Sequence, residues 1–239
     1  MGSWRVWRTI LIIVVILGGL FYAADWFAVR VVEDRAAEKA RTSEGLEHKP
    51  KLSIDHFPRP FLTQVLFGKI KHVSIKAEDV NADGGRQDVR ITTFTADLYG
   101  VKLTDNFSRA TADRATGDAF VSYDDLSKSA PPGVKVSAAP PAADGTARVK
   151  LSASLPGLGS GGLSVFSRVQ VSGQKITLHA ESMPKEITAL GLEKSVRAGI
   201  DFDTNLTHLP SGISLTKAVG TATGMDIKAA GRNVELVSG

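Results

Sequence analysis

The stretch ILIIVVILGGLFYAA, residues 10–24, decides how the rest of the chain is interpreted, because it carries no charge and almost no polar group. Apolar and aromatic residues extend it on both sides: Trp4, Trp7, Trp26, Phe27 and Val29. Residues 9–29 are therefore a predicted transmembrane helix, since about 20 such residues cross the hydrocarbon core of a bilayer.

A cleavable secretory signal is the alternative, and it needs small residues three positions and one position before the cut. Cuts after Ala23, Ala24 or Ala28 would each place a large aromatic residue at the first of these positions. Those residues are Phe21, Tyr22 and Trp26. The sequence therefore favours an uncleaved signal anchor.

The orientation of this anchor does not follow from the basic residues alone, because two precede the span and four follow it closely. Long domains are exported largely regardless of their charge, and a short basic segment before an apolar run is typical of exported proteins. We expect residues 1–8 to form a cytoplasmic tail. The expected location is the cell membrane, crossed once, with the C-terminal domain outside the cytoplasm.

The composition indicates one ordinary domain after the anchor. The chain has 239 residues, and about 190 of them remain for a domain after the span and the residues next to it are set aside, enough to bury roughly 70% of the surface of an unfolded domain. There is no cysteine, which excludes disulfides and thiolate metal sites. The net charge of +4 comes from scattered residues, whereas nucleic-acid binding favours a basic stripe with interleaved aromatic residues.

The hydrophobic pattern predicts a mainly β (α+β) domain over residues 48–239, joined to the anchor by a helical stalk over residues 30–47. In the stalk, apolar residues recur at helical steps: Val29, Val32, Ala36 and Ala40. Most later segments alternate apolar and polar residues and are separated by short turns, which predicts antiparallel strands. Short helices are expected after Pro60 and over residues 185–198. We expect a curved sheet that encloses an elongated apolar cavity.

No motif predicts catalysis or a cofactor. Residues 157–162 match G-x-G-x-x-G, but a strand rather than a helix is expected after them, so a hairpin loop is favoured. Asp201 and Asp203 fall on the polar face of a predicted strand, and Tyr123-Asp124-Asp125-Leu126 is typical of a helix start or a turn. The histidines lack metal-ligand spacing, and no serine lies in a nucleophile elbow. We expect neither an enzyme nor a metal site.

The apolar segment Phe57 to Phe67 has two interpretations. It forms either a helix packed on the core or a flap at the mouth of a cavity, close to the membrane.

Several segments together resemble a known family. They are HFPRPFLTQVLFGK (56–69), VSIKAEDV (73–80), ADLYGV (96–101), SYDDL (122–126) and GMDIKAAGRNVEL (224–236). Over nearly all of residues 30–237 the chain resembles the actinobacterial LmeA-like phospholipid-binding family, and the first segment is the most specific part. The resemblance implies an anchored or exported envelope protein that binds phospholipid in an elongated, mainly β structure, similar to tubular lipid-binding folds. It also implies a role in cell-envelope lipid or glycolipid maintenance.

The hypothesis from the sequence is a membrane-anchored, non-enzymatic protein with phospholipid as its partner and no cofactor. The candidate lipid-binding residues are Phe61, Leu62, Leu66, Phe94, Leu98, Leu151, Val169 and Leu178. The alternative is a structural or scaffold protein of the cell envelope that binds no lipid.

Overall fold

The computed structural model describes residues 3–43, 45–82, 88–104, 109–153, 163–189, 191, 193–205 and 209–237. The helices are α1 (Ser3–Ser43), α2 (Phe61–Leu66), α3 (Tyr123–Lys128), α4 (Lys185–Ala189) and α5 (Glu193–Ile200). The strands are β1 (Lys51–Ile54), β2 (Lys69–Ala82), β3 (Val89–Thr104), β4 (Arg109–Ser122), β5 (Val134–Ala138), β6 (Ala147–Ala153), β7 (Leu163–Ser172), β8 (Lys175–Ala180), β9 (Phe202–Asn205), β10 (Ile213–Gly220) and β11 (Gly224–Val237).

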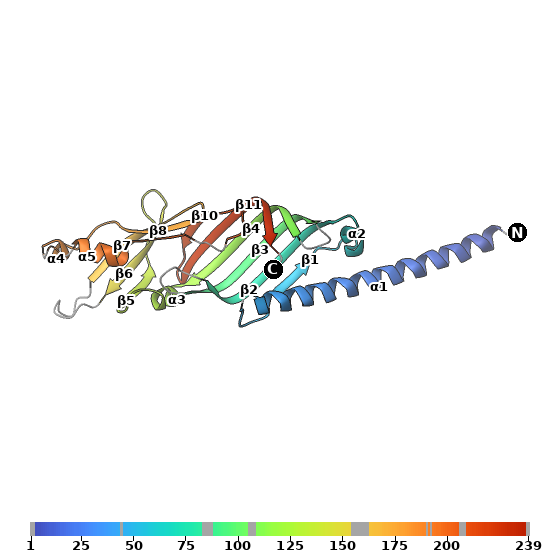
Figure 1. Ribbon diagram of the computed structural model, residues 1–239, viewed down its shortest axis with the longest axis horizontal. Coiled ribbons are helices and arrows are strands. Elements are labelled where there is room, and N and C mark those ends of the chain that lie inside the picture. Colours follow the sequence, from blue (N-terminus) through green and yellow to red (C-terminus); the bar gives the residue numbers. More distant parts are fainter. Residues whose placement is uncertain are drawn as a thin grey trace.

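These strands form two antiparallel sheets, arranged one after the other along an elongated molecule (Figure 1). The first sheet has six strands in the order β1-β2-β3-β4-β11-β10, and the second has five in the order β5-β6-β7-β8-β9. The predicted fold class, mainly β with an N-terminal apolar helix, is confirmed. The predicted helix over residues 185–198 is divided into α4 and α5, and Gly191 between them has a φ of +69°.

Helix α1 is continuous from the apolar stretch into the predicted stalk, and its second half packs against the first sheet. Asp25, Val29 and Ala37 are buried on one side of the helix, at multiples of four residues. Glu33 lies on the same side, and its Oε1 accepts a hydrogen bond from the Ile54 N–H of β1 at 2.7 Å. Val32, which belongs to the same predicted apolar series as Val29, is 40% exposed. The stalk is therefore part of the folded domain.

Four long strands of the first sheet share an irregularity that changes the spacing of their inward-facing residues from two to three. On β3, Leu98 and Val101 are both buried, and Gly100 between them has a φ of +63°. A Cβ at Gly100 would collide with the Asp113 carboxylate of β4, which Lys69 and Lys102 bind at 2.9 and 2.7 Å. Irregularities of this kind bend and twist a strand while keeping its apolar side chains on one face.

Helix α3 connects the two sheets, and its first turn is capped by its own sequence. Ser122 is the N-cap residue, and its Oγ accepts a hydrogen bond from the Asp125 N–H at 3.1 Å. The same hydroxyl donates to Asp125 Oδ2 at 2.7 Å, and the Lys128 ammonium lies 2.9 Å from Oδ1. The helix start expected at Tyr123 is confirmed, and the buried Asp125 carboxylate is part of the hydrogen-bonded cap.

Packing of α1 on the domain can be tested with two valines of that helix. Val29→Ala should lower the free energy of unfolding by about 2 kcal/mol, because it removes buried methyl groups and leaves a cavity. Val32→Ala is the matched control and should change it by less than ~0.5 kcal/mol. The measurement is denaturant unfolding of the full chain in detergent, followed by the circular dichroism of the sheets. Equal effects of the two changes would contradict the packing.

The α3 cap should make stability depend on pH. The Ser122 hydrogen bond, and then Lys128, hold the pKa of Asp125 below its ordinary value of 3.8. The folded state therefore binds this proton more weakly than the unfolded chain, so the stabilisation is complete above that value and is lost as the pH falls below it. Ser122→Ala should cost about 1 kcal/mol at neutral pH and less in acid.

Asp124, the exposed neighbour of Asp125, offers a control for this pH effect. Asp124→Asn alters a carboxylate of the same helix that lies outside the cap. Unfolding curves at several pH values would measure both variants. A cost of Ser122→Ala that stays constant into strong acid would contradict the role assigned to Asp125.

Candidate functional site

The first sheet has one apolar face, and the strand register shows which residues lie next to one another across it. One cross-strand row joins β2, β3, β4, β11 and β10 through Ala77, Phe94, Ala119, Ile227 and Ala218. The next row joins the same strands through Ile75, Ala96, Gly117, Ala229 and Leu215. All ten residues face the same side, because directly paired residues of a sheet do so.

We call the middle of these two rows the central apolar face. It consists of Ile75, Ala77, Phe94, Ala96, Gly117, Ala119, Ile227 and Ala229. Apart from Ala77, which is buried, these residues are only half-buried. The described helices therefore leave an apolar surface in the middle of the sheet that is partly open.

Two buried cores flank the central apolar face. The first contains Val29 of α1, Phe61 of α2 and the inward-facing residues Val73, Leu98 and Ala115 of the neighbouring row. The second lies where the sheets meet and joins Met225 of β11 to Tyr123 and to residues of the second sheet. Met225 is two residues from Ile227 on the same strand, so apolar residues continue from one core to the other.

The central strand β4 carries only small residues on this face between residues 110 and 119. They are Ala110, Ala112, Ala115, Gly117 and Ala119. A sheet core is normally filled by large aliphatic side chains that interdigitate. Here β4 contributes nothing larger than a methyl group, which leaves the space above it to the neighbouring strands or to another molecule.

The eight residues expected to line a lipid site are found in four places. Phe61 and Leu98 lie in the first core, while Leu151, Val169 and Leu178 lie in or against the second. Phe94 lies on the central apolar face. Leu62 and Leu66 are 36% and 80% exposed on α2. The alanines and glycine of β4 were not among them, although the alternation of small residues in ATADRATGDA (110–119) signals this face.

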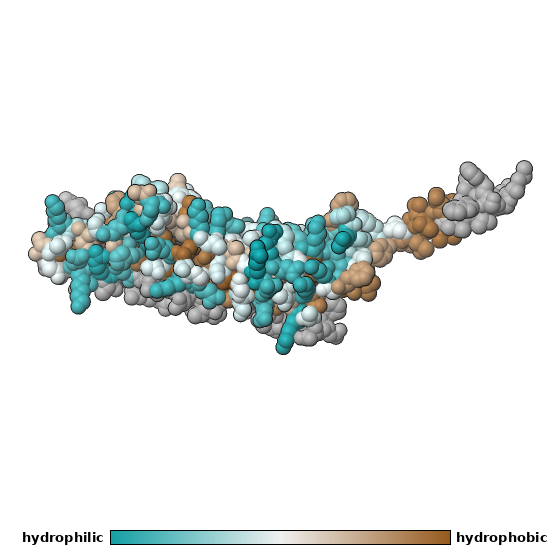
Figure 2. All heavy atoms as spheres, turned by 90° about the horizontal axis from the view of Figure 1, so that it is seen from above, coloured by the Kyte–Doolittle hydropathy of each residue, from teal (hydrophilic) through white to brown (hydrophobic). Residues whose placement is uncertain are grey.

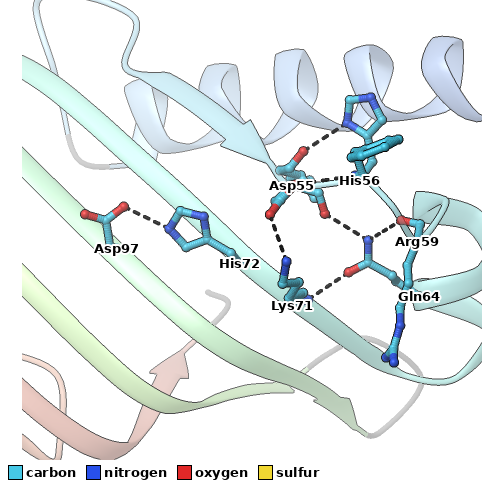
Figure 3. Close-up of polar contacts among 9 residues, drawn as sticks. Asp55, His56, Arg59, Gln64, Lys71, His72 and Asp97 are labelled. Atoms are coloured by element: carbon cyan, nitrogen blue, oxygen red, sulfur yellow. Dashed lines mark hydrogen bonds and ion pairs between the residues drawn. The ribbon is translucent and has the colours of Figure 1, made fainter.

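Helix α2 and the loop before it are fixed by a buried glutamine, Gln64 (Figure 3). Its Nε2 donates to the backbone oxygens of Asp55 and Arg59 at 2.8 and 2.9 Å. Its Oε1 accepts from the Lys71 N–H of β2 at 2.8 Å. The exposed apolar residues of this segment are therefore held in place by the polar groups beneath them.

Of the acidic residues considered for catalysis, Asp201 has structural partners. Asp201 Oδ1 accepts from the Ala180 N–H at 2.8 Å, and its Oδ2 lies 3.0 Å from His179 Nδ1. The side chain of Asp203 and the loop over residues 157–162 lie outside the described residues. Within the part of the chain that the structure describes, no three potential ligands gather as a metal site would require.

Comparison with known proteins assigns the family. No curated protein and no solved structure matches the chain. A family model described as LmeA-like phospholipid-binding matches residues 23–230, which covers the packed half of α1, the second sheet and the first sheet up to the middle of β11. The resemblance in the sequence is thus confirmed, and the chain belongs to the LmeA-like phospholipid-binding family.

Proposed function

We propose that this protein is anchored in a membrane by α1 and binds phospholipid with the acyl chains against the central apolar face. The family is a phospholipid-binding one, which supports lipid as the ligand. The observation that carries the proposal is the half-buried apolar surface between two buried cores. The domain lies outside the cytoplasm and supports maintenance of envelope lipids or glycolipids.

The free energy needed to withdraw an acyl chain from a bilayer is large, so a protein that holds the chain needs a large apolar surface. Withdrawing an acyl chain of about 16 carbons from a bilayer costs on the order of 12 kcal/mol, at ~0.8 kcal/mol per methylene. The two rows extend over five adjacent strands, or about 19 Å at ~4.8 Å per strand spacing. The first core, the central apolar face and the second core follow one another along the strands, so a tail that lies across the strands on the central apolar face has apolar protein on either side.

The anchoring part of the proposal is supported by the helix itself. The described part of α1 contains a segment long and apolar enough to cross a membrane, and most of its side chains are exposed. Its second half is folded onto the domain through Val29 and Ala37. The anchor therefore holds the lipid-binding sheet next to a bilayer.

Filling the space above β4 should displace lipid. In Ala119→Trp the indole would occupy the central apolar face beside Phe94 and Ile227, while the half-buried position leaves room for the fold. The full chain is reconstituted in vesicles that contain phospholipid with a photoactivatable group on its acyl chain. Crosslinks are then mapped by mass spectrometry. Crosslinks to β4 and β11 should fall several-fold, and those to α1 should not change.

The matched control is Asp118→Trp, which places the same side chain on the opposite, exposed face of β4. It breaks only a surface ion pair with Lys228, which is worth less than ~1 kcal/mol. Circular dichroism checks that both variants are folded. Crosslinks on α1 with none on the sheets of the unmodified protein would contradict lipid binding and favour a scaffold protein without lipid.

A further inference from the structure

The segment around α2 exposes apolar side chains in a way that the described part of the domain otherwise avoids. Outside α1, its exposed large hydrophobic residues are Phe57, Leu62, Leu66, Phe67 and Phe166. The first four belong to a single stretch of eleven residues, which we call the apolar tip; Phe57, Leu66 and Phe67 are 71%, 80% and 79% exposed. Figure 2 shows hydrophobic residues gathered where α1 meets the domain, at the end that carries α2.

A hydrogen bond fixes the level of the apolar tip along α1. The Leu62 N–H donates to Asp25 Oδ1 at 2.7 Å, so the tip lies beside residue 25 of the helix. Trp26 and Phe27 at the same level are 46% and 66% exposed, and aromatic residues are enriched where membrane helices enter the headgroup region. If α1 spans the bilayer over residues 9–29, residue 25 lies about 6 Å inside the end of the span.

The charge of Asp25 gives a second reason to place the tip in the bilayer. It is the only charged residue between positions 9 and 29. A carboxylate that faces lipid at this depth is costly, and such residues normally face protein. Asp25 is 1% exposed because the domain covers it, and one of its oxygens satisfies the first turn of α2. Shielding of this residue requires the tip to enter the membrane with the helix.

We propose that the apolar tip inserts into the leaflet from which α1 emerges and forms a second contact with the same bilayer. Phe57, Leu62, Leu66 and Phe67 enter the boundary between headgroups and acyl chains, a depth of about 5–10 Å that is typical of interfacial segments. The exposed Arg59 between them is placed to meet lipid phosphates. The proposal rests on the anchoring by α1 proposed above, and it does not require lipid in the central apolar face.

The chain contains no cysteine, so single cysteines can be labelled without removing any. Leu66→Cys, Phe67→Cys, Val15→Cys and Ala222→Cys are each labelled with an environment-sensitive fluorophore in the full chain. Vesicles of phosphatidylcholine and phosphatidylglycerol carry nitroxide groups at defined depths. Labels at Leu66 and Phe67 should show blue-shifted emission and strong quenching by shallow nitroxides. The label at Ala222, exposed in the turn between β10 and β11, should show neither.

The label at Val15 of α1 separates failure of this proposal from failure of the anchor. Quenching at Val15 without quenching at Leu66 and Phe67 would overturn insertion of the tip and leave the anchor intact. Absence of quenching at all three positions would overturn both. A blue shift at Leu66 without lipid quenching would also overturn the proposal, because it would mean that protein rather than lipid covers the tip.

Two variants of Asp25 test the link between α1 and the tip. Asp25→Asn keeps an oxygen that accepts from the Leu62 N–H, and tip quenching should persist. Asp25→Leu removes the acceptor, so quenching at Leu66 should become weaker or more variable in depth, while quenching at Val15 stays the same. Identical quenching in both variants would overturn the role of Asp25 in positioning the tip.

Discussion

The structure depends on a mismatch between an apolar sheet face and the elements that cover it. Six antiparallel strands turn their apolar side chains to one side, and such a face has to be buried by protein or by another molecule. Val29 of α1 and Phe61 of α2 belong to the core at one end, and the second sheet contributes to the core at the other. Between these cores the central apolar face is only half-buried, and the proposal of a lipid ligand rests on this incomplete cover.

The sequence predicted the parts of this arrangement that depend on local pattern. Alternation indicated the antiparallel strands, the uncharged run indicated the long helix, and Ser122 with Asp125 indicated a helix start. It did not predict which strands pair, because pairing depends on contacts between distant segments. The row of Ala77, Phe94, Ala119 and Ile227 exists only in the paired sheet. For the same reason, residues such as Leu98 and Leu151, expected in one site, lie in separate cores.

Small residues were the signal that is hardest to interpret from sequence. An alanine at position 115 or 119 is compatible with a strand, a helix or a packed core, and it does not reveal that five such positions line one strand face. Val29 and Val32 show the same limit, since both fit the apolar side of a helix but only Val29 is buried. The family match begins at residue 23, so the packed half of α1 belongs to the shared domain.

The contacts of α1 with the domain also fix the rotational orientation of the β-sheets about the helix. A domain joined to a membrane helix by a flexible linker would rotate freely relative to that helix. Here Asp25 and Glu33 each accept a backbone hydrogen bond from the domain, so helix and domain turn as one body. Any membrane protein that packs against one side of α1 would therefore always lie next to the same side of the β-sheets.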